Sequence, residues 1–125
     1  MRLLLDTHIF IWAAFGHRRL TDAARKLIRD ADEVYVSAAS IWEASIKLGL
    51  GKLDIDLTML VAEISKSGYV GLPVSITHAS RVRQLPDIHR DPFDRLLIAQ
   101  ALSEPLQFIT ADERLGAYSE MVITV

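Results

Sequence analysis

The chain begins Met1-Arg2-Leu3-Leu4-Leu5-Asp6, three consecutive leucines that run directly into an aspartate. A strand with one face in water alternates apolar and polar residues, and residues 2–5 do not alternate. They therefore predict a short strand that is covered on both faces, as strands of a parallel sheet are. A carboxylate directly after such a strand lies at the sheet edge where open α/β folds place their sites.

Strand-like and helix-like segments alternate along the rest of the chain. Two helix starts are well marked: Thr21 is a good N-cap, and Asp91 precedes Pro92, whose missing N–H does no harm at a first helical position. The predicted strands are 2–5, 33–36, 69–74, 106–110 and 121–125, and Pro73 places the end of the third at a sheet edge. The predicted helices are 7–15, 22–31, one from Ser37 or Ser40 to about 48, one from Asp56 or Thr58 to 67, 77–85, 91–104 and 113–118. This order predicts an α/β fold, a three-layer α/β/α sandwich with a mainly parallel central sheet.

The size and composition of the chain suit one globular domain over residues 1–125. The absence of cysteine excludes disulfides, thiolate metal sites and cysteine nucleophiles. The longest apolar run, 9–15, is too short to span a membrane, and an acid at position 6 comes too early for a signal peptide, so we expect a cytoplasmic protein. The mean hydropathy of +0.23 is high for a small soluble chain and favours some apolar surface for a partner or a second copy.

The net charge of −2 provides no overall positive field that would attract nucleic acid. This weakens a simple nucleic-acid-binding module more than a metal-dependent nuclease, which has an acidic centre and keeps its cations at the rim. The candidate rim residues are Arg18, Arg19, Lys47, Lys52, Arg90 and Arg95.

Four acidic residues are the candidate site: Asp6, Glu43, Asp94 and Asp112. Asp6 and Asp112 follow predicted strands, and each could instead be only the cap of the next helix. Glu43 lies one turn into its helix and is spaced for a surface ion pair with Lys47. Asp94 is the third residue of the helix opened by Asp91 and Pro92, where the helix dipole alone would favour an acid.

The conjunction of these four acids favours a metal site. Carboxylates gathered closely repel one another, so either some take up protons or a cation joins them. A divalent metal held by carboxylates is typical of phosphate chemistry.

Together these segments resemble the PIN-domain family, and within it the VapC-type toxins of toxin–antitoxin pairs. Leu4-Leu5-Asp6-Thr7-His8 is similar to the first family motif, Ser40-Ile41-Trp42-Glu43 to the second, and Thr110-Ala111-Asp112 to the last. The most specific likeness is His89-Arg90-Asp91-Pro92-Phe93-Asp94-Arg95-Leu96-Leu97-Ile98-Ala99-Gln100-Ala101, with Asp94 as the third acid. The resemblance covers essentially the whole chain.

The resemblance implies an endoribonuclease dependent on Mg²⁺ or Mn²⁺, in which Asp6, Glu43 and Asp94 bind the metal and activate a water. Asp112 would be a fourth ligand or a helper. The family also implies a cognate antitoxin as partner, a homodimer and a structured RNA substrate such as a tRNA or a ribosomal RNA loop.

Other residues near these motifs receive lesser roles. Thr7 and Thr110 are expected to orient carboxylates through their hydroxyls. Arg95 is expected either to touch an RNA phosphate or to pair with Asp91. His8 is expected to serve in packing or hydrogen bonding, and His89 to be a loop residue near the rim, since metal-activated water needs no histidine base.

Three alternatives remain at this stage. A receiver-like signalling domain also has an α/β/α fold and an acidic Mg²⁺ pocket, but it expects two adjacent acids after the first strand and a lysine near the chain end. Here Thr7 follows Asp6, and the last lysine is Lys66. A non-catalytic binding domain conflicts with four retained acids, whose repulsion costs stability without a cation. A PIN-type nuclease for RNA processing or for DNA is the third alternative.

Overall fold

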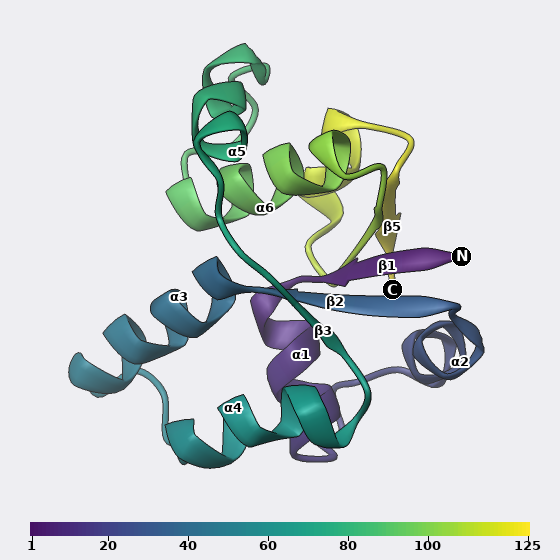
Figure 1. Ribbon diagram of the computed structural model, residues 1–125, viewed down its shortest axis with the longest axis vertical. Coiled ribbons are helices and arrows are strands. Elements are labelled where there is room, and N and C mark those ends of the chain that lie inside the picture. The colour runs from purple at the N-terminus through teal and green to yellow at the C-terminus, as the bar shows by residue number, and fades with distance from the viewer.

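A sheet of five parallel strands forms the centre of the computed structural model, which describes residues 1–125 (Figure 1). The strand order is β3-β2-β1-β4-β5, and all neighbouring pairs are parallel. The strands are β1 (Arg2–Leu5), β2 (Glu33–Ser37), β3 (Val70–Leu72), β4 (Gln107–Thr110) and β5 (Val122–Thr124). The predicted parallel sheet is confirmed.

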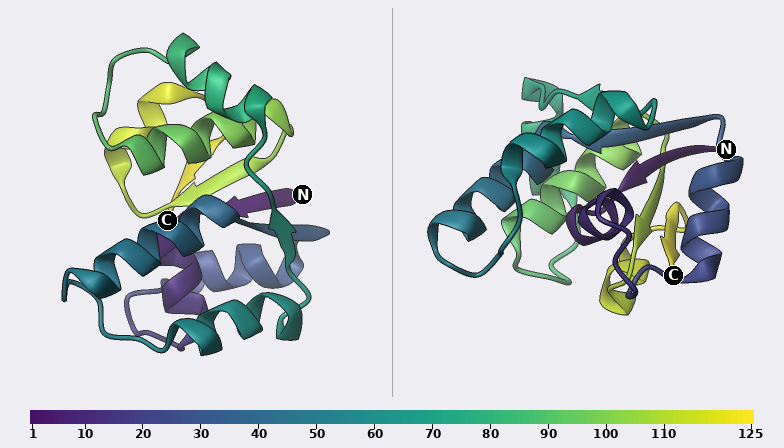
Figure 2. Two further views of the ribbon diagram at one scale, coloured as in Figure 1. Left: turned by 60° about the vertical axis from the view of Figure 1, so that its left-hand side comes forward. Right: turned by 90° about the horizontal axis from the view of Figure 1, so that it is seen from below.

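Helices cover both faces of the sheet, so the three-layer sandwich is also confirmed (Figure 2). The α-helices are α1 (Thr7–Ala14), α2 (Asp22–Asp30), α3 (Ala38–Gly49), α4 (Leu57–Lys66), α5 (Ile76–Arg81) and α6 (Pro92–Ser103). Two 3₁₀-helices complete the chain, η1 (Val82–Gln84) and η2 (Glu113–Tyr118). In the view of Figure 1, α1, α2, α3 and α4 lie below the sheet, and α5 and α6 lie above it.

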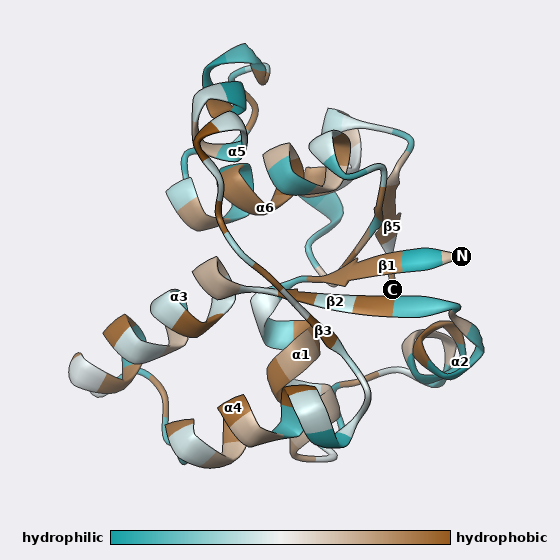
Figure 3. Cartoon of the chain, viewed as in Figure 1, coloured by the Kyte–Doolittle hydropathy of each residue, from teal (hydrophilic) through white to brown (hydrophobic).

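Strand β1 is the central strand of the sheet and is buried on both faces. Leu3, Leu4 and Leu5 are fully buried. Leu3 and Leu5 belong to the apolar cluster beneath α1, α2 and α4, whereas Leu4 belongs to the cluster beneath α6. Most of β1 is coloured as hydrophobic in Figure 3. This two-sided burial is the reason why residues 2–5 lack polar alternation.

Side-chain caps fix the starts of several helices, including α3 and α6, which carry site residues. The structure selects Ser37, whose Oγ accepts from the Ala39 N–H at 3.0 Å, as the cap of α3. Asp56 caps α4 by accepting from the Met59 N–H at 3.1 Å. Asp91 caps α6 as expected.

Two predicted elements differ from the structure. The third strand is only Val70–Leu72 and lies at the sheet edge, as Pro73 indicates. The helix expected at 77–85 is instead α5 followed by η1. It starts earlier because Ser75 and His78 form a capping box, in which histidine takes the place of the usual glutamate.

The strand order creates a crevice between β1 and β4. From β1 the chain builds β2 and β3 on one side, and it later adds β4 and β5 on the other. Ligands of open α/β sheets bind at such a switch point, beyond the carboxyl ends of the strands. Separately, none of the helices combines the length and the apolar character that crossing a membrane requires.

Candidate active site

A pocket of about 320 Å³ lies at this switch point. All four predicted acids line it, although they come from four separate segments of the chain. The lining residues are Asp6, His8, Trp12, Arg19, Glu43, Lys47, His89, Asp91, Asp94, Ala111, Asp112 and Arg114. The structure thus brings the predicted site residues together.

Asp6 connects β1 to α1 and is buried, with 7% of its surface exposed. One carboxylate oxygen accepts from the Thr7 N–H at 2.7 Å, and the other accepts from the Thr110 hydroxyl at 2.6 Å. Burial raises the pKa of Asp6, and these two hydrogen bonds partly oppose the rise. Asp6 is therefore both a helix cap and a pocket carboxylate, and Thr110 donates a hydrogen bond to it.

Glu43 reaches the pocket from α3 and is 4% exposed. Its Oε1 accepts from the Thr7 hydroxyl at 2.7 Å, and its Oε2 pairs with Lys47 Nζ at 2.8 Å. The expected ion pair with Lys47 forms, but inside the pocket and not on the open surface. Burial lowers the pKa of Lys47, but the hydrogen bond and charge of Glu43 and the nearby aspartates outweigh it, so the pKa of Lys47 is raised.

Asp94 projects from the first turn of α6 into the pocket, among the other acids. Burial and then the charges of Asp6, Asp91, Glu43 and Asp112 raise the pKa of Asp94 to about 8. An isolated aspartate would be fully ionised at neutral pH, so burial and the neighbouring carboxylates together favour the protonated form of Asp94.

Asp112, like Glu43, has a cationic partner of its own. It caps η2 and accepts from Arg114 Nε at 3.0 Å and Nη2 at 2.8 Å. The hydrogen bond from the Arg114 side chain lowers the pKa of Asp112. Arg114 was not among the expected rim residues, although its spacing of two from Asp112 permits this pairing.

The donor set fits a hard divalent cation. Carboxylate oxygens are the ligands that Mg²⁺ and Mn²⁺ prefer. A cation among Asp6, Glu43 and Asp94 would offset the charges of these acids and return the pKa of Asp94 toward its ordinary range.

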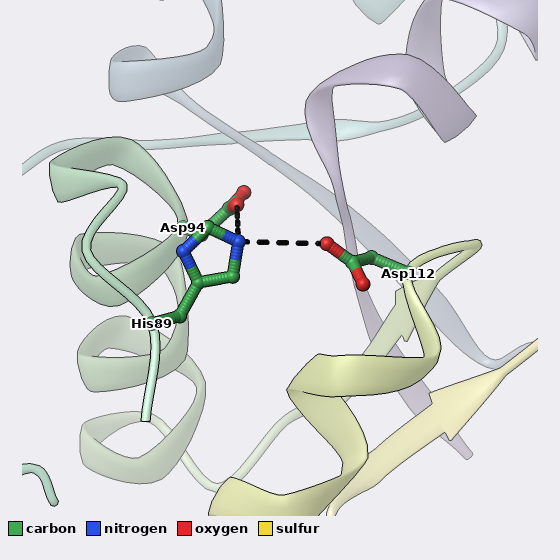
Figure 4. Close-up of side chains that lie close together, drawn as sticks. All are labelled: His89, Asp94 and Asp112. Atoms are coloured by element: carbon green, nitrogen blue, oxygen red, sulfur yellow. Dashed lines mark ion pairs between the residues drawn. The ribbon is translucent and has the colours of Figure 1, made fainter. Parts of the chain in front are cut away.

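His89 lies in a loop, as expected, and its side chain also lines the pocket beside two of the acids. Its Nε2 lies 3.6 Å from a carboxylate oxygen of Asp94 and 3.6 Å from one of Asp112 (Figure 4). The side chain is 14% exposed. The available signal in the sequence was the position of His89 two residues before the cap Asp91, within reach of that residue's free N–H.

Arg95 does not face the pocket, which corrects its expected role as an RNA contact. Its guanidinium donates to the carbonyls of Pro86 at 2.9 Å and Val82 at 3.1 Å, and to the hydroxyl of Tyr118 at 3.2 Å. It forms no ion pair with Asp91 either, because these acceptors occupy it.

The cations that do line the pocket are Arg19, Lys47 and Arg114. Arg19 lies over the ring of Trp12, 5.7 Å from its centroid. This contact places a guanidinium and an aromatic face together at one side of the pocket.

The chain matches a model of the PIN domain over residues 3–121. It belongs to the PIN-domain family. Ribonuclease VapC22 of Mycobacterium tuberculosis is 30% identical over 121 residues, which are 93% of this chain and 91% of that protein.

Solved structures show the same PIN fold. A toxin–antitoxin complex from Klebsiella pneumoniae matches with a TM-score of 0.68 and 21% identity over 98% of this chain and 96% of that chain. VapC20 of M. tuberculosis, a toxin that cleaves the sarcin–ricin loop, matches with a TM-score of 0.58 and 18% identity over 94% of this chain and 97% of that one. The expected PIN-like architecture is thereby confirmed.

Proposed function

We propose that residues 1–125 form one PIN nuclease domain, a metal-dependent endoribonuclease that acts as the toxin of a toxin–antitoxin pair. The observation that carries this proposal is the convergence of Asp6, Glu43, Asp94 and Asp112 on one pocket, where burial and the charges of neighbouring acids raise the pKa of Asp94 to about 8. Buried carboxylates lower the stability of the fold unless a cation pairs with them, and a bound metal at the sheet switch point would be that cation.

Asp6, Glu43 and Asp94 would hold Mg²⁺ or Mn²⁺, with Asp112 as a fourth ligand or a helper. When bound, such a metal lowers the pKa of a coordinated water and offsets charge on a phosphate. Thr7 and Thr110 hold two of the carboxylates in place through short hydrogen bonds. In the reaction, the water oxygen forms a bond to phosphorus while a bond from phosphorus to a sugar oxygen breaks and that oxygen leaves with a proton.

The proposed substrate is a structured RNA, a tRNA or a ribosomal RNA loop. The relative VapC22 is named a ribonuclease, and VapC20 a toxin that cleaves the sarcin–ricin loop. The pocket rim supports nucleic acid as substrate, since Arg19 can contact phosphate.

The proposed partners are a cognate antitoxin and a second copy of the chain, in the cytoplasm. Likeness to a chain of a toxin–antitoxin complex supports the first partner. Large apolar side chains remain exposed, including Trp42 at 60%, Leu50 at 63% and Ile76 at 90%, and such surface suits protein contacts.

The test is incubation of partner-free protein with total cellular RNA, with single-stranded DNA in a parallel reaction. We expect discrete RNA fragments in Mg²⁺ or Mn²⁺, none in EDTA, and none from Asp94→Asn. Cleavage of the DNA and not of the RNA would show that the domain is a DNA nuclease and would contradict the proposed substrate. Equal cutting by Asp94→Asn would contradict the proposed site.

A further inference from the structure

The ring of His89 presents an unused hydrogen-bond donor to the pocket. Its Nε2 is shielded from solvent and has no hydrogen-bond partner. The nearest acceptors, carboxylate oxygens of Asp94 and Asp112, both lie at 3.6 Å, beyond hydrogen-bond length (Figure 4). Buried polar atoms are rarely left without a partner, so this nitrogen indicates a missing acceptor.

The other ring nitrogen determines where the proton lies. His89 Nδ1 accepts a hydrogen bond from the Asp91 N–H at 3.0 Å. A nitrogen that accepts carries a lone pair, so the ring proton is on Nε2. In this orientation Nε2 donates and cannot bind a metal, although it lies close to two carboxylates.

The backbone of His89 is held from two further elements. The Tyr118 hydroxyl in η2 accepts from the His89 N–H at 2.8 Å, and Arg95 in α6 donates to the His89 carbonyl at 3.4 Å. Arg95 therefore holds the loop that carries His89, and this is why its guanidinium points away from the pocket. Together with the bond from Asp91, these contacts fix the direction in which Nε2–H points before any ligand arrives.

We propose that His89 is a further catalytic residue of the nuclease, which donates a hydrogen bond from Nε2–H to a non-bridging oxygen of the scissile phosphate. The inference rests on the proposed ribonuclease function. The phosphate oxygen is the missing acceptor: it would reach Nε2, which is shielded from solvent in the free protein, by entering between Asp94 and Asp112. The ring keeps its proton throughout and stabilises the charge that develops on the phosphate.

A neutral donor has an advantage at this position. Lysine or arginine would pair with Asp94 and Asp112 and oppose a divalent cation there, as Arg114 already pairs with Asp112. A neutral N–H can bind phosphate oxygen without neutralising the acids.

Two substitutions separate this role from a purely structural one. In His89→Asn the shorter amide keeps an acceptor near the Nδ1 position for the Asp91 N–H, but no donor reaches the Nε2 position. In His89→Gln the longer amide places a donor near Nε2 and loses the acceptor. Single-turnover cleavage should be about 100-fold slower for Asn, the typical loss for one such donor, and within about 10-fold of wild type for Gln. The reverse order would show that His89 only supports the loop and would overturn the proposal.

A second readout does not depend on cleavage. Long-range ¹H–¹⁵N spectra of the wild-type ring should show a neutral Nε2–H tautomer, and its signal should shift when inorganic phosphate is added with Mg²⁺. An Nδ1–H tautomer, or no shift at saturating phosphate, would contradict the inference. Wild-type protein that cuts no RNA would instead refute the proposed function itself, and circular dichroism of both variants shows whether they are folded.

Discussion

Asp94 carries a large electrostatic cost in the pocket. Its pKa is about 8 in the folded chain, against an ordinary value of 3.8, so the folded state holds this proton more tightly than the unfolded state. Without metal, the free energy of unfolding should therefore fall as pH rises from about 4 to about 8. Below that window the group is protonated in both states, and above it the group is ionised in both.

Asp94→Asn should remove this pH dependence, because the amide cannot ionise. In EDTA at pH 8 the variant should be more stable than wild type by on the order of 1–2 kcal/mol, an estimate reduced for the partial exposure of the group. Urea unfolding at pH 5 and pH 8 measures the change in unfolding free energy. The variant Asp54→Asn, at an exposed position, is the control and should behave like wild type. An equal change in unfolding free energy between pH 5 and pH 8 for wild type and Asp94→Asn would refute the raised pKa of Asp94.

Thr110 is expected to matter only through its hydroxyl. Thr110→Val keeps the shape of the side chain but removes the donor to Asp6, which is 2.6 Å away. Loss of such a support typically weakens metal binding or activity about 10- to 100-fold. Metal titration and cleavage rates measure the effect, and the exposed Thr124→Val on the neighbouring strand should change neither. An unaltered Thr110→Val would mean that Asp6 needs no orienting partner.

At the scale of elements, the N-terminus of α6 stabilises the helix and also positions residues of the pocket. Asp91 Oδ1 accepts from the backbone N–H groups of Phe93 at 2.8 Å and Asp94 at 3.3 Å, and thereby fixes the first turn that projects Asp94. The N–H of Asp91 also orients His89. One residue thus positions an acid and a donor of the same pocket.

Asp91→Ala should therefore lower both stability and cleavage, whereas Asp56→Ala, the matched cap of α4, should lower stability alone. Each should cost about 1 kcal/mol of unfolding free energy. Urea unfolding and single-turnover cleavage of both variants provide the comparison. Similar cleavage by the two would mean that the α6 cap has no part in the geometry of the site.

Elements whose signals are local could be predicted from the sequence. The leucine run of β1 and the Asp91–Pro92 start of α6 depend on neighbours along the chain, and the structure has both. The start of α5 could not be predicted as readily, because His78 acts as a capping partner and is also fixed by Glu104, 2.6 Å away and far along the sequence.

At the scale of the whole molecule, the sheet order assembles the pocket. Asp6 and Asp112 follow strands β1 and β4, which are neighbours only because the chain reverses its direction of sheet growth. Three of the acids could be predicted from local position, since Asp6 and Asp112 follow strands and Asp94 lies in the first turn of α6, whereas Glu43 lies in the middle of α3. The inward direction of the His89 side chain could not be predicted, because it depends on contacts of its backbone with Tyr118 and Arg95, which lie in two other elements.

The central claim is that these acids form one site for a divalent cation, and calorimetric titration of Mn²⁺ into metal-free protein tests it most directly. We expect saturable binding to wild type and binding at least about 10-fold weaker to Asp94→Asn. Loss of folding would not explain that result, since Asp94→Asn should be the more stable protein without metal. Equal Mn²⁺ affinity in the two proteins, or no binding to wild type, would contradict the account.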